Sequence, residues 1–186
     1  MRDPARVAIL ISGRGSNLRA LVEQASGYQV ALVASNKPDA AGLGWAKARG
    51  LATWSLESKS MAKEEYDRQL SAALMQHGVG TIALAGFMRI LSPWFVEEWR
   101  GRILNIHPSL LPKYRGLDTH ARALEAGDKF SGCSVHIVTE ELDAGAVLGQ
   151  AEVPIEPGDT PETLEQRILA AEHILYPRIL GEFVKR

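Results

Sequence analysis

Short apolar segments alternate along the first half of the chain with stretches in which apolar residues recur at helical spacing. The run Val7–Ile11 contains no polar residue, as is typical of a strand buried on both faces of a sheet. Further strands are predicted at residues 30–34, 52–56, 81–85 and 103–106. Helices are predicted between them at residues 16–26, 41–49 and 63–76, with Ser16 as the N-cap of the first. This alternation favours right-handed crossovers and a largely parallel sheet.

The second half of the chain follows a different pattern. Two strands are predicted at Ser134–Thr139 and Val147–Ile155, and the short turn between them suits an antiparallel pair rather than a crossover. A final helix is expected to begin within residues 159–162, and Pro177 is expected to kink or end it. We therefore predict an α/β fold: an open, mostly parallel, twisted sheet with helices on both faces and an antiparallel C-terminal portion.

The composition is that of an ordinary globular domain. The chain has 186 residues, of which 46% are hydrophobic. Lys and Arg number 21 against 22 Asp and Glu, so the net charge of −1 does not favour binding to nucleic acid or to an acidic membrane. The single cysteine, Cys133, excludes an internal disulfide and cysteine-rich zinc motifs. With no long apolar run, we expect a cytoplasmic protein with neither membrane nor nucleic-acid partners.

A glycine-rich turn follows the first predicted strand and is the first candidate binding site. It reads Ser-Gly-Arg-Gly-Ser-Asn over residues 12–17. Ligands of open α/β sheets bind at the carboxyl ends of strands, and a helix N-terminus offers free N–H groups to an anion. Leu18 stands at the third glycine position of GxGxxG, and the turn is not a Walker A loop. The pattern favours a phosphate site, and a ligand-free helix-capping turn is the alternative.

Asn105 and His107 form the second candidate site. They stand two residues apart at the end of the fifth predicted strand, so their side chains share one face. Pro108 and Pro112 follow and stiffen the loop. An amide and an imidazole on one face can stabilise an oxyanion, and the imidazole can transfer protons near neutral pH. A purely structural histidine is the alternative.

The other histidines carry weaker signals. His77 ends a helix, His173 lies on the last helix, and His120 and His136 have no evident partner in the sequence. No HxxxH or similar spacing occurs among the histidines, so we predict no metal site.

Asp143 lies in the short turn between the two late strands, within Glu140–Gly145. An acid in a glycine-containing turn is most often a turn former. If the turn folds over His107, the carboxylate instead pairs with the imidazole and helps it to move protons. Spacing alone leaves both interpretations open.

Four motifs occur in order along nearly the whole chain. They are residues 12–18, 85–91, 105–112 and 141–145. Together they resemble the phosphoribosylglycinamide formyltransferase family, the folate-dependent transformylases of purine synthesis. The resemblance implies one formyltransferase domain over residues 1–186, with a Rossmann-like nucleotide-phosphate half up to about residue 100 and a catalytic and folate-loop half beyond it. It also implies transfer of the formyl group of 10-formyltetrahydrofolate, as co-substrate, to the amine of glycinamide ribonucleotide, without a metal.

The resemblance assigns roles to individual residues. The catalytic trio falls on Asn105, His107 and Asp143, which would stabilise the oxyanion and assist proton transfer. The ribonucleotide contacts fall on Gly15, Ser16, Asn17, Pro108 and Glu172. The folate contacts fall on Lys63, Met88, Arg89, Ile90, Leu91, Asn105, Thr139, Glu140, Glu141, Leu142 and Asp143.

Three residues depart from the family pattern. Lys63 stands where the family can place an arginine for the acidic folate tail, so the charge is kept and the planar fork is lost. Arg115 stands where relatives often have proline, and Asp118 where some have histidine. The last two follow the catalytic loop and put no catalytic residue in doubt.

Three other functions share parts of this pattern. Formyltetrahydrofolate deformylase uses water as acceptor and has an additional N-terminal domain, and methionyl-tRNA formyltransferase has a further C-terminal domain for tRNA. We expect neither, because the predicted sheet begins near Arg6 and 186 residues leave room for one domain. A nucleotide-binding module with a vestigial site would bind phosphate without turnover. The sequence leaves open whether the protein is a monomer or a homodimer.

Overall fold

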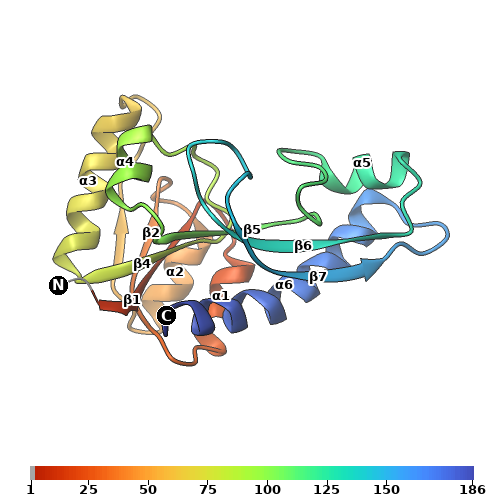
Figure 1. Ribbon diagram of the computed structural model, residues 1–186. Coiled ribbons are helices and arrows are strands. Elements are labelled where there is room, and N and C mark those ends of the chain that lie inside the picture. The colour runs from red at the N-terminus through yellow and green to blue at the C-terminus, as the bar shows by residue number, and fades with distance from the viewer. Residues whose placement is uncertain (1–2) are drawn as a thin grey trace.

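The computed structural model describes residues 3–186, and a single mixed sheet lies at its centre (Figure 1). Its strands are β1 (Asp3–Ile11), β2 (Gln29–Ser35), β3 (Thr53–Ser55), β4 (Val79–Leu84), β5 (Ile103–His107), β6 (Phe130–Ile137) and β7 (Val147–Pro154). Their order in the sheet is β3-β2-β1-β4-β5-β6-β7. Strands β1 to β5 pair in parallel with one another, whereas β6 is antiparallel to both β5 and β7.

Helices cover both faces of this sheet, and each face has its own apolar core. The helices are α1 (Ser16–Glu23), α2 (Ala41–Ala48), α3 (Lys63–Gln76), α4 (Pro93–Glu98), α5 (Thr119–Glu125) and α6 (Pro161–Phe183). Helices α1, α2 and α6 lie on one face, where the buried residues include Leu18 and Ile168. Helices α3 and α4 lie on the other face, where the buried residues include Leu70 and Phe95.

The uninterrupted apolar run in β1 follows from this layered arrangement. Val7, Ile9 and Ile11 belong to the core on the side of α1, α2 and α6, and Ala8 and Leu10 belong to the core on the side of α3 and α4. All five side chains are 0% exposed. Because successive side chains point to opposite faces, a central strand between two helical layers has no position for a polar residue.

The predicted fold class is confirmed, including the antiparallel C-terminal part. Each predicted strand is present, and the helix predicted at residues 63–76 has those bounds in the structure. Helices α4 and α5 lie outside the prediction. They have six and seven residues, too few to show a helical period in the sequence.

The start of α1 corrects one prediction. Ser16 is the first helical residue and not the N-cap, which is Gly15 with φ of 74° and no side-chain cap. This left-handed backbone strains any residue with a side chain, and a Cβ here would lie 3.1 Å from the Leu18 side chain. The turn therefore requires glycine, and no side chain caps the first N–H groups of α1.

Helix α6 does not end at Pro177 but continues to Phe183, so of the two predicted outcomes, a kink or an end, the structure excludes the end. Proline has no N–H for the carbonyl four residues earlier, which is that of His173. The Gln24 side chain supplies a donor instead, with Nε2 3.0 Å from the His173 oxygen. A tertiary contact thus satisfies the group that would otherwise favour ending the helix at this proline.

The fold brings the two candidate sites to one edge of the sheet. The strand order reverses between β1 and β4, and open α/β sheets bind ligands at the carboxyl ends of strands near such a point. The glycine turn follows β1, and Asn105 and His107 lie at the end of β5. Antiparallel β6 then places His136 directly opposite Asn105.

Tyr176 of α6 ties this helix to the ends of β4 and β5. Its buried hydroxyl lies 3.1 Å from the carbonyl oxygens of both Leu84 and Leu104. Tyr176→Phe keeps the ring and removes the donor from two buried carbonyls. We expect the free energy of unfolding to fall by about 1–3 kcal/mol in urea denaturation. An unchanged value would mean that the hydroxyl adds nothing to the anchoring of α6.

Candidate active site

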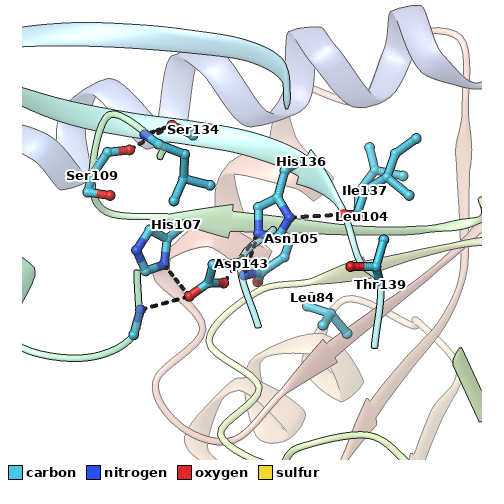
Figure 2. A network of polar contacts seen from close by, with 12 residues as sticks. Leu84, Leu104, Asn105, His107, Ser109, Ser134, His136, Ile137, Thr139 and Asp143 are labelled. Carbon is cyan, nitrogen blue, oxygen red and sulfur yellow. Dashed lines mark hydrogen bonds and ion pairs between the residues drawn. The ribbon is translucent and has the colours of Figure 1, made fainter. Parts of the chain in front are cut away.

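Three polar side chains meet at the end of β5 (Figure 2). Asn105 and His107 lie on β5, and Asp143 lies in the loop between β6 and β7. His107 Nδ1 is 3.3 Å from Asp143 Oδ2, and the two side chains are only 6% and 7% exposed. The loop therefore folds back over β5, and the contact between Asp143 and His107 that the sequence left open is present.

Asp143 has two further partners. The Gly116 N–H donates to its Oδ2 at 3.0 Å, and His136 Nε2 lies 3.4 Å from its Oδ1. Burial acts to raise the pKa of Asp143, but the contacts with His136 and Gly116 and the nearby imidazoles outweigh it and hold the pKa below its usual range. The carboxylate is therefore ionised at neutral pH.

The partners of His107 indicate which of its nitrogens carry hydrogen. His107 Nε2 is 2.9 Å from the Tyr114 carbonyl oxygen, which can only accept, so this nitrogen is a donor. His107 Nδ1 faces the ionised Asp143 carboxylate, which also only accepts. His107 Nδ1 therefore lies where the Asp143 carboxylate can stabilise a proton on this nitrogen.

His136 is a residue of this site that the sequence analysis set aside. Its Nε2 contacts Asp143, lies 3.3 Å from Asn105 Nδ2, and belongs to a ring that is almost fully buried. Its Nδ1 is 3.0 Å from the Ile137 carbonyl oxygen. The expectation that His136 has no partner is wrong, because the partners come from β5 and the β6–β7 loop. These partners could have been predicted only from the residue-by-residue pairing of β5 with β6, in which His136 lies opposite Asn105. The sequence alone does not give that register.

The loop after β5 supports the site through its backbone. The Tyr114 carbonyl contacts His107, and the Gly116 N–H contacts Asp143. Tyr114 has φ of 55°, which is costly for a residue with a side chain, whereas Gly116 adopts its φ of 80° without that cost. Arg115 between them forms an ion pair of 2.7 Å with Glu141, which links this loop to the β6–β7 loop. Asp118, the next departure from the family pattern, is the left-handed N-cap of α5.

A second polar pair joins the glycine turn to α6. Asn17 Nδ2 donates to Glu172 Oε2 at 2.7 Å, and Asn17 Oδ1 is buried without a hydrogen-bond partner. Burial raises the pKa of Glu172 to about 7, although the Asn17 hydrogen bond lowers it. Gly15, Ser16 and Pro108 are partly exposed. The unsatisfied amide oxygen and the protonatable acid give this side of the site unused hydrogen-bonding capacity.

The residues that the resemblance assigns to folate come from the start of α3, the loop after β4, the end of β5 and the β6–β7 loop. In the loop after β4, Met88 and Ile90 are 73% and 69% exposed, whereas Leu91 is buried. The β6–β7 loop holds an exposed group: Thr139, Glu140, Glu141 and Leu142. Lys63 is exposed at the first position of α3, and the half-buried Arg89 lies with its guanidinium 4.7 Å from the centre of the Tyr66 ring.

Three further properties of residues 3–186 bear on function: metal-binding clusters, the reactivity of the thiol and membrane-spanning helices. Within residues 3–186, no group of three or more His, Cys, Asp or Glu side chains is arranged to hold a metal ion. Burial raises the pKa of the Cys133 thiol to about 12, so this cysteine is not a thiolate nucleophile at neutral pH. None of the helices in the same range is long and apolar enough to span a bilayer.

Comparison with known proteins places this chain in a family. The formyl transferase family pattern matches residues 5–180. The chain is 47% identical over 182 residues to phosphoribosylglycinamide formyltransferase of Escherichia coli, covering 95% of this chain and 86% of that protein. It is 51% identical to the trifunctional purine biosynthetic protein adenosine-3 of Drosophila melanogaster, but it spans only 14% of that longer protein while 96% of this chain is matched.

Solved structures give the same result. The crystal structure of phosphoribosylglycinamide formyltransferase from Brucella melitensis superimposes with a TM-score of 0.92 at 49% identity, covering 98% of this chain and 96% of that one. The chain thus belongs to the formyl transferase family, whose members are formyl-transferring enzymes. The E. coli relative and the Brucella structure are both named phosphoribosylglycinamide formyltransferase. The Drosophila relative is named a trifunctional purine biosynthetic protein.

Glu172 yields a prediction about stability and pH. Its pKa is about 7 in the folded protein against an ordinary 4.5, so the folded state binds more protons than the unfolded state between these values. The free energy of unfolding should therefore fall as pH rises from about 4.5 to about 7. The variant Glu172→Gln has a neutral side chain at every pH, so its free energy of unfolding should not show this fall. We expect it to be more stable than the parent by on the order of 3 kcal/mol at pH 8 and of similar stability at pH 5, in urea denaturation.

An exposed glutamate on the same helix provides the control. Glu182→Gln should follow the pH dependence of the parent protein. A stability difference between Glu172→Gln and the parent that is the same at both pH values would contradict the proton-linked explanation.

Proposed function

We propose that the protein transfers the formyl group of 10-formyltetrahydrofolate to the amine of glycinamide ribonucleotide. The observation that carries this proposal is the buried contact of His107 with Asp143 beside Asn105, at the ligand-binding edge of a formyl transferase fold. The names of the relatives support a formyl group as the group transferred and a glycinamide ribonucleotide as its acceptor, and the sequence resemblance implies the folate donor. The geometry of the three side chains supports the chemistry.

The proposed reaction proceeds by direct attack. The amine nitrogen of the nucleotide bonds to the formyl carbon, whose carbonyl oxygen becomes an oxyanion on a tetrahedral carbon. The Asn105 amide is a donor suited to that oxyanion, and a protonated His107, whose two ring nitrogens face Tyr114 and Asp143, would stabilise it through its positive charge. Fixed donors in a site with little water need no reorganisation during the reaction, which is the main source of their effect. Binding both substrates side by side supplies the orientation, so no covalent enzyme intermediate is needed.

Proton transfer completes the proposed reaction. The attacking amine loses a proton, the bond between the formyl carbon and N10 of the folate breaks, and N10 gains a proton. Asp143 is placed to stabilise the imidazolium of His107 and to assist this transfer, directly or through a water. His136 shares the same carboxylate, so it helps to hold Asp143 in place.

Each of the two substrates has candidate binding residues in addition to this group. For the ribonucleotide, the uncapped N-terminus of α1 at Gly15 to Asn17 suits the phosphate, Pro108 borders the site, and the Glu172 carboxyl suits ribose hydroxyls. For the folate, the exposed apolar residues Met88, Ile90 and Leu142 suit the flat pterin. For the acidic tail of the folate, two cationic residues are suited: Lys63 at the start of α3, and Arg89, whose guanidinium lies over the Tyr66 ring of the same helix.

A steady-state assay with glycinamide ribonucleotide and 10-formyltetrahydrofolate tests the proposal. We expect formylglycinamide ribonucleotide and tetrahydrofolate in equal amounts. Absence of formyl transfer by folded protein would contradict the enzyme assignment and would favour a nucleotide-binding module. Release of formate without the nucleotide would instead favour a deformylase.

The same assay tests the role of Asp143. Asp143→Asn keeps the shape of the side chain and removes the charge that supports His107. We expect kcat to fall by roughly 100-fold or more, the scale of lost acid–base assistance. Asp39→Asn, which changes an exposed aspartate outside the site, should leave kcat unchanged. A normal kcat in Asp143→Asn would remove this residue from the mechanism.

A further inference from the structure

Ser12 directly follows β1 and is hydrogen-bonded to the loop after β4. Its side chain is 5% exposed. The Ser12 Oγ accepts a hydrogen bond from the Met88 N–H at 2.8 Å and donates one to Asn36 Oδ1 at 2.6 Å. The Ser12 N–H donates to the Gly86 carbonyl at 3.1 Å. One residue therefore holds the loop after β4 at two points.

The Ser12 hydroxyl is part of a buried polar chain that crosses the carboxyl ends of neighbouring strands. Asn36 follows β2, and its Nδ2 lies 3.5 Å from Ser58 Oγ, in the loop after β3. The links follow the sheet order β3-β2-β1-β4. Asn36 and Ser58 are only 8% and 6% exposed, so water has little access to replace a missing partner.

The loop that Ser12 holds presents apolar side chains to solvent. Met88 and Ile90 are large apolar residues that are 73% and 69% exposed. Arg89 between them reaches back to the same polar chain, with Nη1 3.4 Å from the Ser58 carbonyl oxygen. The hydrogen bonds from Ser12 fix the backbone of this segment, so its exposed apolar side chains form a preorganised surface for a flat apolar ligand.

We propose that Ser12 is a positioning residue for folate binding, because its hydroxyl holds the Met88–Leu91 segment in the conformation that receives the co-substrate. The inference rests on the proposed function and deepens it. A hydroxyl can donate and accept at once, and hydrogen bonds in such a chain strengthen one another. Without it, the Met88 N–H and Asn36 Oδ1 lose their shared partner, and the released loop must be ordered again when the folate binds.

Three measurements on Ser12→Ala test the inference. The dissociation constant of tetrahydrofolate, the proposed product, is measured by anaerobic calorimetric titration, and we expect it to rise roughly 10-fold. In the steady-state assay, KM for the formyl folate should rise by more than kcat falls. Hydrogen exchange of residues 86–91, followed by mass spectrometry without any ligand, should quicken by roughly 10-fold or more in the variant.

Thr81→Val is the matched control. The Thr81 side chain is also buried and hydroxyl-bearing, and its Oγ1 donates to the Pro4 carbonyl at 2.8 Å, near the amino end of β4. This variant also loses one buried hydrogen bond and should lose some stability. Its tetrahydrofolate affinity and the exchange of residues 86–91 should equal those of the parent. A general effect of weakened packing would change both variants alike.

The outcomes separate this inference from the proposed function. Unchanged exchange of residues 86–91 and unchanged tetrahydrofolate affinity in Ser12→Ala would overturn the inference. A parent protein with neither tetrahydrofolate affinity nor formyl transfer would overturn the proposed function, and with it the folate role of Ser12. If Ser12→Ala does not fold, Asn36→Ala removes the acceptor of the same hydroxyl, and the same two measurements decide the question.

Discussion

The carboxylate of Asp143 is the group on which the arrangement of the site depends. A charge buried to this degree is stable only when it is paired and hydrogen-bonded. Asp143 meets this requirement with the imidazoles of His107 and His136 and with the Gly116 N–H. Its own φ of 50° shows that the loop adopts an unfavourable backbone conformation to bring it there. The carboxylate and the two rings therefore constrain the β6–β7 loop, the loop after β5 and the pairing of β5 with β6 together.

The mixed sheet explains how these groups come together. Its parallel part ends in loops at one edge, which provides the glycine turn after β1 and the exposed segment after β4. A parallel neighbour on the other side of β5 would place its own carboxyl end at that same edge and lead into a crossover. Antiparallel β6 instead places His136 opposite Asn105 and leads into a short connection that returns over His107. The change of strand direction beside β5 is thus a condition for the site.

Much of the fold could be predicted from the sequence, because it depends on local patterns. The apolar run Val7–Ile11 indicates a doubly covered strand whichever helices cover it, and a short turn between two strands indicates an antiparallel pair. The prediction that Ser16 caps α1 was wrong, and so was the alternative that α6 ends at Pro177. Gly15 takes the cap position by a left-handed backbone, and Gln24, distant in sequence, satisfies the carbonyl that Pro177 leaves free.

The sequence by itself determined the order of the strands and helices. It also located the glycine-rich turn at residues 12–17, the proline-containing loop after Asn105 and His107, and residue types able to stabilise an oxyanion and move protons. The tertiary structure decided which of these residues meet. Asp143 contacts His107, His136 joins them, and Ser12 holds the Met88 backbone, although each pair is far apart along the chain. Periodicity and capping act over a few neighbouring residues, whereas hydrogen bonds between loops depend on strand order, register and direction, which arise only when the whole sheet is assembled.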